Sequence, residues 1–109
     1  MATFFKNSVV KNVGTQPVEI LTTSATNRAT VIGLSLTNLE DDFVYVSVLL
    51  KDDTSVTGFY LKDTVLPANT SLRVVNQGEK LIIAPNNTLY VQSTLNDSVD
   101  VIMSYVEIT

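Results

Sequence analysis

Apolar and polar residues alternate along several stretches of this chain, and this period of two constrains its fold more than any other feature. The clearest stretch runs over residues 44–48, Val-Tyr-Val-Ser-Val. Successive side chains of a β-strand point to opposite faces, so this alternation predicts a strand with one face in a core. No long stretch shows the 3.6-residue period of a helix, and we expect little or no helix.

The same rule predicts about nine strands. Their residues are 4–13, 18–22, 30–38, 43–51, 58–65, 71–75, 80–84, 88–93 and 99–108. The connecting segments are rich in Gly, Pro, Asn and Asp, which favour turns; examples are residues 14–17, 51–54 and 76–78. Short strands separated by such turns predict an all-β fold, an antiparallel β-sandwich that is jelly-roll-like or immunoglobulin-like.

The length of 109 residues fits one domain, so we expect residues 1–109 to form one unit around one core. The apolar fraction is an ordinary 45%, with many valines. Because β-branched residues fit a pleated and half-buried surface, this composition favours strands.

The charge pattern makes nucleic acid an unexpected partner. The net charge is −4, and the seven basic residues are scattered along the chain, so the surface would repel phosphate. No apolar run approaches the length that spans a membrane, and no membrane contact is expected. Residues 1–6 do not resemble a secretory signal and cysteine is absent, so we expect synthesis in a cytoplasm.

The chain contains neither histidine nor cysteine. It therefore lacks the commonest general base, the usual activator of a serine nucleophile and the soft metal ligands. Ser35 and Ser47 are interpreted as polar positions on a sheet face. The four glycines lie too far apart to form a phosphate-binding loop. We expect no catalytic residue, no cofactor and no dedicated metal site.

Two acidic clusters, at residues 40–42 and 52–53, fall in expected turns and are interpreted as solvated turn residues. Two alternatives stay open. The two loops could together form a weak calcium site, because calcium binds carboxylate and carbonyl oxygens. An enzyme would have to depend on acids such as Asp42 and Asp53, since paired carboxylates suffice for glycoside cleavage.

Several expected strands are apolar on both faces. Val31, Ile32 and Leu34 are expected in the core. For Met103, Tyr105 and Ile108 of the last strand, a core position and a subunit contact stay equally open. In the adjacent pairs Phe4-Phe5 and Phe59-Tyr60 only one member can enter the same core, which leaves the other for a partner or a covering loop. The candidate interface residues are Phe4, Phe5, Phe59, Tyr60, Met103, Tyr105 and Ile108.

Four segments of the chain resemble small virion structural proteins of tailed bacteriophages, especially phages of cyanobacteria and marine bacteria. These segments are residues 29–38, 46–48, 66–72 and 98–109. The resemblance implies a β-sandwich that assembles in copies on the virion after synthesis in the host bacterial cytoplasm. It would serve as a capsid decoration or cement protein, or as a neck, tail or baseplate component.

The resemblance also implies that the partners are other virion proteins and further copies of the chain, and it brings no catalytic residues or cofactor. The alternative function is a receptor- or glycan-binding module of a phage adhesion device, with loops 52–57 or 86–88 as the binding site. No sequence feature supports a glycan ligand directly.

Overall fold

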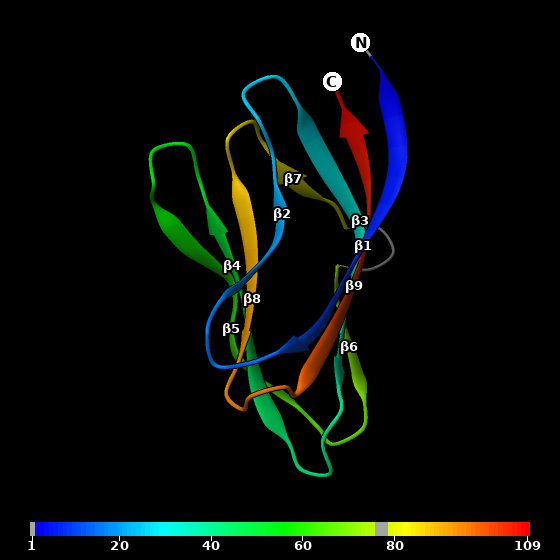
Figure 1. Ribbon diagram of the computed structural model, residues 1–109, viewed down its shortest axis with the longest axis vertical. Helices are drawn as coiled ribbons and strands as arrows, with labels where there is room; N and C mark the ends of the chain where they lie inside the picture. The colour runs from blue at the N-terminus through cyan, green and yellow to red at the C-terminus, as the bar shows by residue number, and fades with distance from the viewer. Residues whose placement is uncertain (1, 76–78) are drawn as a thin grey trace.

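The computed structural model describes residues 2–75 and 79–109, which form two antiparallel sheets packed face to face (Figure 1). The strands are β1 (Thr3–Val13), β2 (Val18–Thr22), β3 (Arg28–Asn38), β4 (Val44–Lys51), β5 (Thr57–Leu66), β6 (Ser71–Val75), β7 (Leu81–Ile83), β8 (Thr88–Ser93) and β9 (Val99–Ile108). The predicted strands are confirmed, with ends that shift by two residues at most. The turn expected at 76–78 lies outside the described residues. The described part of the chain contains no helix that could cross a membrane.

The strand order identifies the sandwich as a jelly roll. Sheet A has the order β1-β9-β3-β6, with β7 also beside β3, and sheet B has the order β2-β8-β4-β5. The antiparallel pairs are therefore nested: β4 with β5, β3 with β6 and β7, β2 with β8, and β1 with β9. Each layer has four strand positions, because β6 and β7 share the place beside β3, and two layers joined in this way are the jelly-roll topology. Of the two sandwich types that the sequence left open, the immunoglobulin-like one is wrong.

Strands β6 and β7 occupy one position in sheet A, beside successive parts of β3. β7 pairs with residues 29–31 of β3, and β6 pairs with residues 34–37. The two ends of the described chain lie side by side at one end of sheet A, where the Thr109 amide donates to the Ala2 carbonyl at 3.0 Å. Figure 1 shows both ends at the same end of the molecule.

The core consists of the inward residues of both sheets and is rich in valine. Val46 and Val48 of β4 and Val91 of β8 face Leu36 and Val101 of sheet A, and all five are fully buried. Burial of one such side chain stabilises the fold by about 1.5–3 kcal/mol before entropy is counted. The alternation that predicted these strands is the alternation between this core and solvent.

A β-bulge in β3 explains one incorrect core prediction. Val31 pairs with Tyr105 and Gly33 pairs with Ser104, so Ile32 is an extra residue with no partner across the ladder. In a regular strand Val31 and Leu34, three positions apart, would point to opposite faces. The extra residue lets both point inward, and both are confirmed as core residues. Ile32 is turned outward and is 44% exposed, so its expected core position is wrong.

The turns follow the chemistry expected of their residues. Positive φ angles occur at Asn12, Ser55, Asp63, Asn69, Asn86 and Asp97 among the described non-glycine residues. All of these except Ser55 are Asn or Asp, the residues that best tolerate the left-handed region. Two of them, Asn69 and Asn86, lie in turns that begin with Pro67 and Pro85.

Candidate assembly surface

The outer face of sheet A carries a group of exposed apolar side chains. Phe5 and Val9 of β1 are 82% and 63% exposed, and Ile102 of β9 is 55% exposed. Ile32 of β3 and Ile82 of β7 continue the group across the sheet. A soluble domain rarely shows a large apolar surface that has no contact function, so this face is the first candidate for a contact site.

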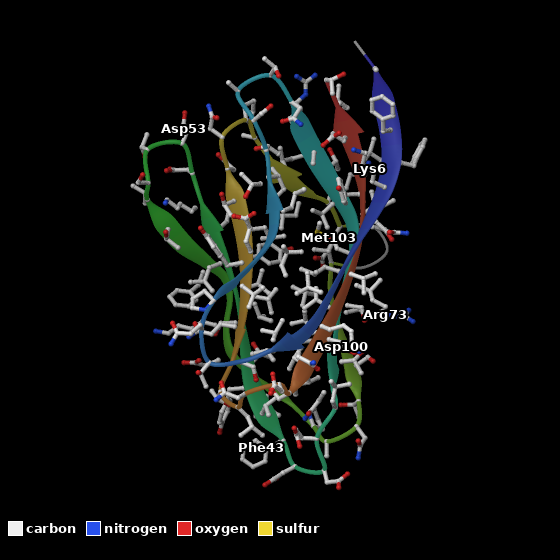
Figure 2. All side chains as sticks on the ribbon, in the orientation of Figure 1. Lys6, Phe43, Asp53, Arg73, Asp100 and Met103 are labelled. Atoms are coloured by element: carbon white, nitrogen blue, oxygen red, sulfur yellow. The ribbon has the colours of Figure 1, made fainter. Side chains whose placement is uncertain are left out.

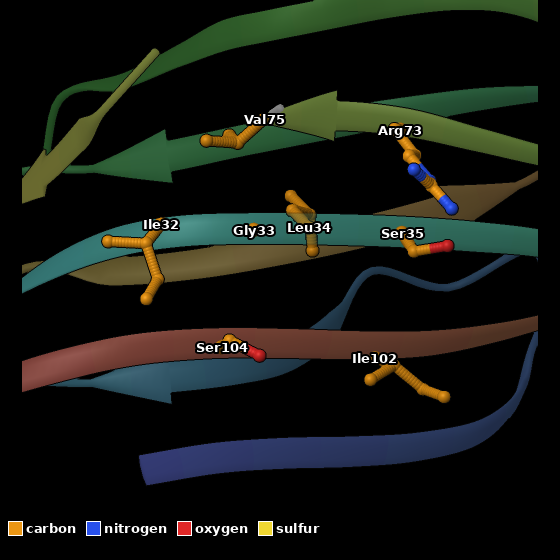
Figure 3. Close-up of a pocket in the computed structure, with 8 residues that line it drawn as sticks. All are labelled: Ile32, Gly33, Leu34, Ser35, Arg73, Val75, Ile102 and Ser104. Carbon is orange, nitrogen blue, oxygen red and sulfur yellow. The ribbon is translucent and has the colours of Figure 1, made fainter. Parts of the chain in front are cut away.

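Figure 3 shows a shallow hollow on this face, with a volume of about 310 Å³. Ile32 and Ile102 border it, and Arg73 of β6 extends along its rim towards Ser35. Within residues 2–75 and 79–109, no carboxylate forms an ion pair with Arg73. The hollow therefore combines apolar walls with an available cation. Figure 2 shows Arg73 pointing away from the sandwich, whereas Met103 lies between the sheets.

Beyond the core, the first residues of β1 are exposed on both faces. Phe4 shares the inner face with Val10 but is 47% exposed. Next to it, Lys6 Nζ lies 3.0 Å from Glu107 Oε1 and 5.7 Å from the centre of the Phe4 ring. The hydrogen bond to Glu107 raises the pKa of Lys6. The start of β1 is therefore a solvent-exposed part of sheet A, and Glu107 balances the charge of Lys6 there.

The outer face of sheet B is also partly apolar. Phe59 and Val65 of β5 are 53% and 49% exposed, and Phe43 packs edge-on against Tyr45 with ring centres 5.5 Å apart. Tyr60 is 39% exposed at a register shift of β5. Partial burial raises the pKa of the Tyr60 phenol, and the nearby Glu79 carboxylate adds to this rise.

Two of the candidate interface residues are in the core instead. Met103 has no exposed surface and Tyr105 is 8% exposed, because both follow Val101 at every second residue of β9. Their assignment to an interface is therefore wrong. Ile108 lies half-buried at the end of β9.

The sequence allowed one member of each aromatic pair to enter the core, but the structure places neither member there. Phe4 and Phe5 lie where β1 extends past the core, and a register shift in β5 leaves both Phe59 and Tyr60 exposed. A contact role for these four residues remains a prediction.

The sequence reasoning missed Val9, Ile82 and Ile102 as surface residues. A signal for Ile102 was present, because Asp100 and Ser104 share its parity and mark the polar face of β9. Ile82 is flanked by the buried Leu81 and Ile83, and a strand of three apolar residues gives no such marker.

The acidic clusters take part in turn hydrogen bonds. Asp52 Oδ1 accepts from the Thr54 hydroxyl at 2.7 Å, the Thr54 amide at 2.9 Å and the Val56 amide at 3.0 Å. These hydrogen bonds lower the pKa of the Asp52 carboxyl, and the bond from the Thr54 hydroxyl has the largest effect. Asp42 accepts from the Phe43 amide, and Asp41 accepts from Asn69. Among the residues that the structure describes, no three acids gather where a metal ion could bind.

The buried serines also have structural partners. Ser47 Oγ accepts from the Asp63 amide at 3.0 Å and donates to Asp63 Oδ1 at 3.4 Å, which holds the irregular backbone of β5. The hydroxyls of Ser93 and Ser98 lie 2.6 Å apart, and Ser98 also donates to the Leu95 carbonyl. The buried hydroxyls therefore stabilise the irregular part of β5 and the turn between β8 and β9.

The fold has been observed before in a protein of very different sequence. No protein-family model and no curated protein matches the chain. A chain from a solved structure of Bacillus endospore appendages, described as a novel family of disulfide-linked pili, aligns with a TM-score of 0.58 and 9% identity. The alignment covers 98% of this chain and 88% of that chain.

A second solved structure, that of infectious bursal disease virus Gt strain, aligns over 98% of this chain and 30% of that chain. Its TM-score is 0.47 at 9% identity, which is too low to support a common fold. At such low identities the likeness to the appendage protein establishes a shared fold and nothing about partners.

Proposed function

We propose that this chain is a non-enzymatic structural subunit that assembles in multiple copies on the particle of a tailed bacteriophage. Its role would be that of a capsid decoration or cement protein, or of a neck, tail or baseplate component. The observation that carries the proposal is the set of large apolar side chains on the outer face of sheet A, which the domain does not need for its own core.

The core does not depend on the apolar side chains of the outer face. Leu34, Leu36, Met103 and the inward valines fill the space between the sheets without any contribution from Ile102, Phe5 or Val9. Exposed apolar residues that do not stabilise the isolated fold are a liability unless a partner covers them. A repeated contact between subunits would cover them, and even weak contacts become strong when symmetry repeats them.

Two further observations support the proposal. The appendage protein that shares the fold belongs to disulfide-linked pili; this chain has no cysteine, so its own subunits would associate without disulfides. The four sequence segments that resemble tailed-phage virion proteins favour a phage particle as the location. The partners would then be other virion proteins and further copies of this chain.

Quantitative mass spectrometry of purified virions tests the proposal. We expect the protein in the particles, in hundreds of copies for a capsid decoration protein and in a few tens or fewer for a ring or spike.

Ile102→Lys should reduce incorporation at least tenfold while the protein stays folded, because it places a charge in the apolar face. Ala25→Lys, at an exposed loop position of β2–β3, is the matched control and should be incorporated normally. Absence of the protein from particles would overturn the proposal.

A further inference from the structure

Three of the four sheet edges are protected against pairing with another strand. β6 and β7 have five and three residues, and β2 has five residues with a register shift between Glu19 and Leu21. β5 has two register shifts and a positive φ at Asp63. Short strands and bulges are common devices that keep an edge from pairing.

The fourth edge, β1, lacks this protection from Thr3 to Val10; its register shift and the positive φ of Asn12 come only after Val10. β1 has eleven residues, and its pairing with β9 is regular from Thr3 to Val10. Nothing in the described part of the chain pairs with its other side. Lys6 points towards the inner face, where a charge could discourage pairing, but Glu107 matches this charge at 3.0 Å. A long and regular edge of this kind is a ready site for strand addition.

The hydrogen bonds show which groups of β1 are available. The Ala2 carbonyl accepts from the Thr109 amide, so the even-numbered residues of β1 bond to β9. The odd-numbered residues Phe5, Asn7 and Val9 therefore direct their amides and carbonyls to the free edge. Their side chains lie on the outer face and are exposed.

We propose that β1 pairs with β1 of a second copy in antiparallel orientation, with Asn7 opposite the partner's Asn7 on a two-fold axis. The pairing would join two copies of sheet A into one continuous sheet, held by roughly six new main-chain hydrogen bonds. The proposal deepens the proposed function and depends on it, because it names a contact through which copies of the chain would assemble.

The sequence of β1 favours this register over its neighbours. With Asn7 at the axis, Phe5 lies opposite the partner's Val9 on the outer face, and Phe4 lies opposite the partner's Val10 on the inner face. Aromatic and β-branched residues are favourable cross-strand neighbours. The pairing also extends the apolar outer face through Phe5 and Val9 of both copies.

The neighbouring registers are worse. With Ser8 at the axis, Phe5 lies opposite the partner's Lys11. With Lys6 at the axis, two lysines face each other, and like charges directly opposite each other destabilise a sheet. A single strand pair also buries less surface than a stable protein complex, so the isolated dimer should be weak and gain strength from repetition on a particle.

Cysteine cross-linking of purified protein tests the register, because the natural chain has no cysteine. Asn7→Cys places two thiols on residues about 5.5 Å apart, within the range of a disulfide. Val9→Cys is the matched control on the same strand and face, and its two thiols would lie too far apart. We expect at least tenfold more oxidised dimer from Asn7→Cys than from Val9→Cys. Equal yields, or no dimer at millimolar concentration, would overturn the proposal.

A charge exchange tests the two-fold symmetry. Asn7→Lys and Asn7→Asp should each weaken dimerisation at least tenfold in sedimentation, and an equimolar mixture should form a heterodimer. Ser104→Lys and Ser104→Asp are the control. Ser104 of β9 pairs with Asn7 but lies one strand further from the edge, so a mixture of these two variants should dimerise no better than either variant alone. A mixture that stays as monomeric as its components contradicts the pairing.

The two proposals fail separately. A protein that cross-links through Asn7→Cys but is absent from virions would overturn the proposed function and support the pairing. A protein present in virions that shows no such cross-link would support the function and overturn the pairing.

Discussion

Asn38 joins three segments of the chain through one buried amide. Its Nδ2 donates to the carbonyls of Asp42, Leu66 and Pro67 at 2.9, 3.1 and 3.2 Å. Its Oδ1 accepts from the Glu40 amide at 2.9 Å, and the residue is 1% exposed. A carboxylate has the same shape but cannot donate, so this site selects the amide over the acid.

Asn38→Ala should lower the free energy of unfolding by about 2–4 kcal/mol, because it leaves buried carbonyls and an amide without partners. Asn38→Asp should lower it more at neutral pH, since a carboxylate would face three carbonyls. This deficit relative to the wild type should shrink towards about pH 4, where the carboxyl regains a proton and can donate. Urea unfolding at both pH values measures the effect.

Asn86→Asp, at an exposed turn position, is the control and should change stability by less than about 0.5 kcal/mol. An Asn38→Asp variant as stable as this control at neutral pH would show that the three carbonyls do not depend on the amide.

At the level of elements, β9 illustrates how one strand serves both the core and the surface. Met103→Ala should destabilise the protein by about 2–5 kcal/mol, because it opens a cavity between the sheets. Ile102→Ala, at the adjacent position, should change stability by about 0.5 kcal/mol or less, because its side chain is largely solvated. Thermal or urea unfolding of the two variants compares the faces directly, and equal losses would contradict the assigned parity.

The strands were predictable from the sequence because alternation and turn chemistry agree along most of the chain. The strands at 18–22, 71–75, 88–93 and 99–108 keep their predicted bounds. The bulge at Ile32 was not predictable, since an inserted residue changes the phase without changing the composition. The strand order depends on pairings between distant segments, which period-two patterns do not encode.

The candidate surface was less predictable than the fold. Phe5 was identified because two adjacent aromatic residues cannot share one face. Met103 was misassigned because β9 is apolar at most positions, so its phase had to be taken from Asp100 and Ser104. The exposure of Phe4 depends on where the core ends, which only the packing of the two sheets determines.

On the scale of the whole molecule, the nested strand pairs suggest an order of folding. β4 and β5 are joined by a short turn that Asp52 stabilises, whereas β1 and β9 lie at opposite ends of the chain. Each pair that forms shortens the loop that the next outer pair must close. Because loop closure costs conformational entropy, we expect the pairs to form from β4–β5 outward to β1–β9.

Val44→Ala and Val13→Ala test this order with matched truncations. Both valines are at most 2% exposed, and each belongs to a single pair of the nest: Val44 pairs with Leu66, and Val13 pairs with Val99. Each truncation should cost about 2 kcal/mol at equilibrium, which is enough for a reliable φ-value. In stopped-flow experiments Val44→Ala should mainly slow folding, with a φ-value of about 0.5 or more. Val13→Ala should mainly accelerate unfolding, with a φ-value below about 0.3, because its contacts form last. The reverse pattern would mean that the sheet closes first at its outer pair, and that the long β1 edge is already ordered before the β4–β5 hairpin forms.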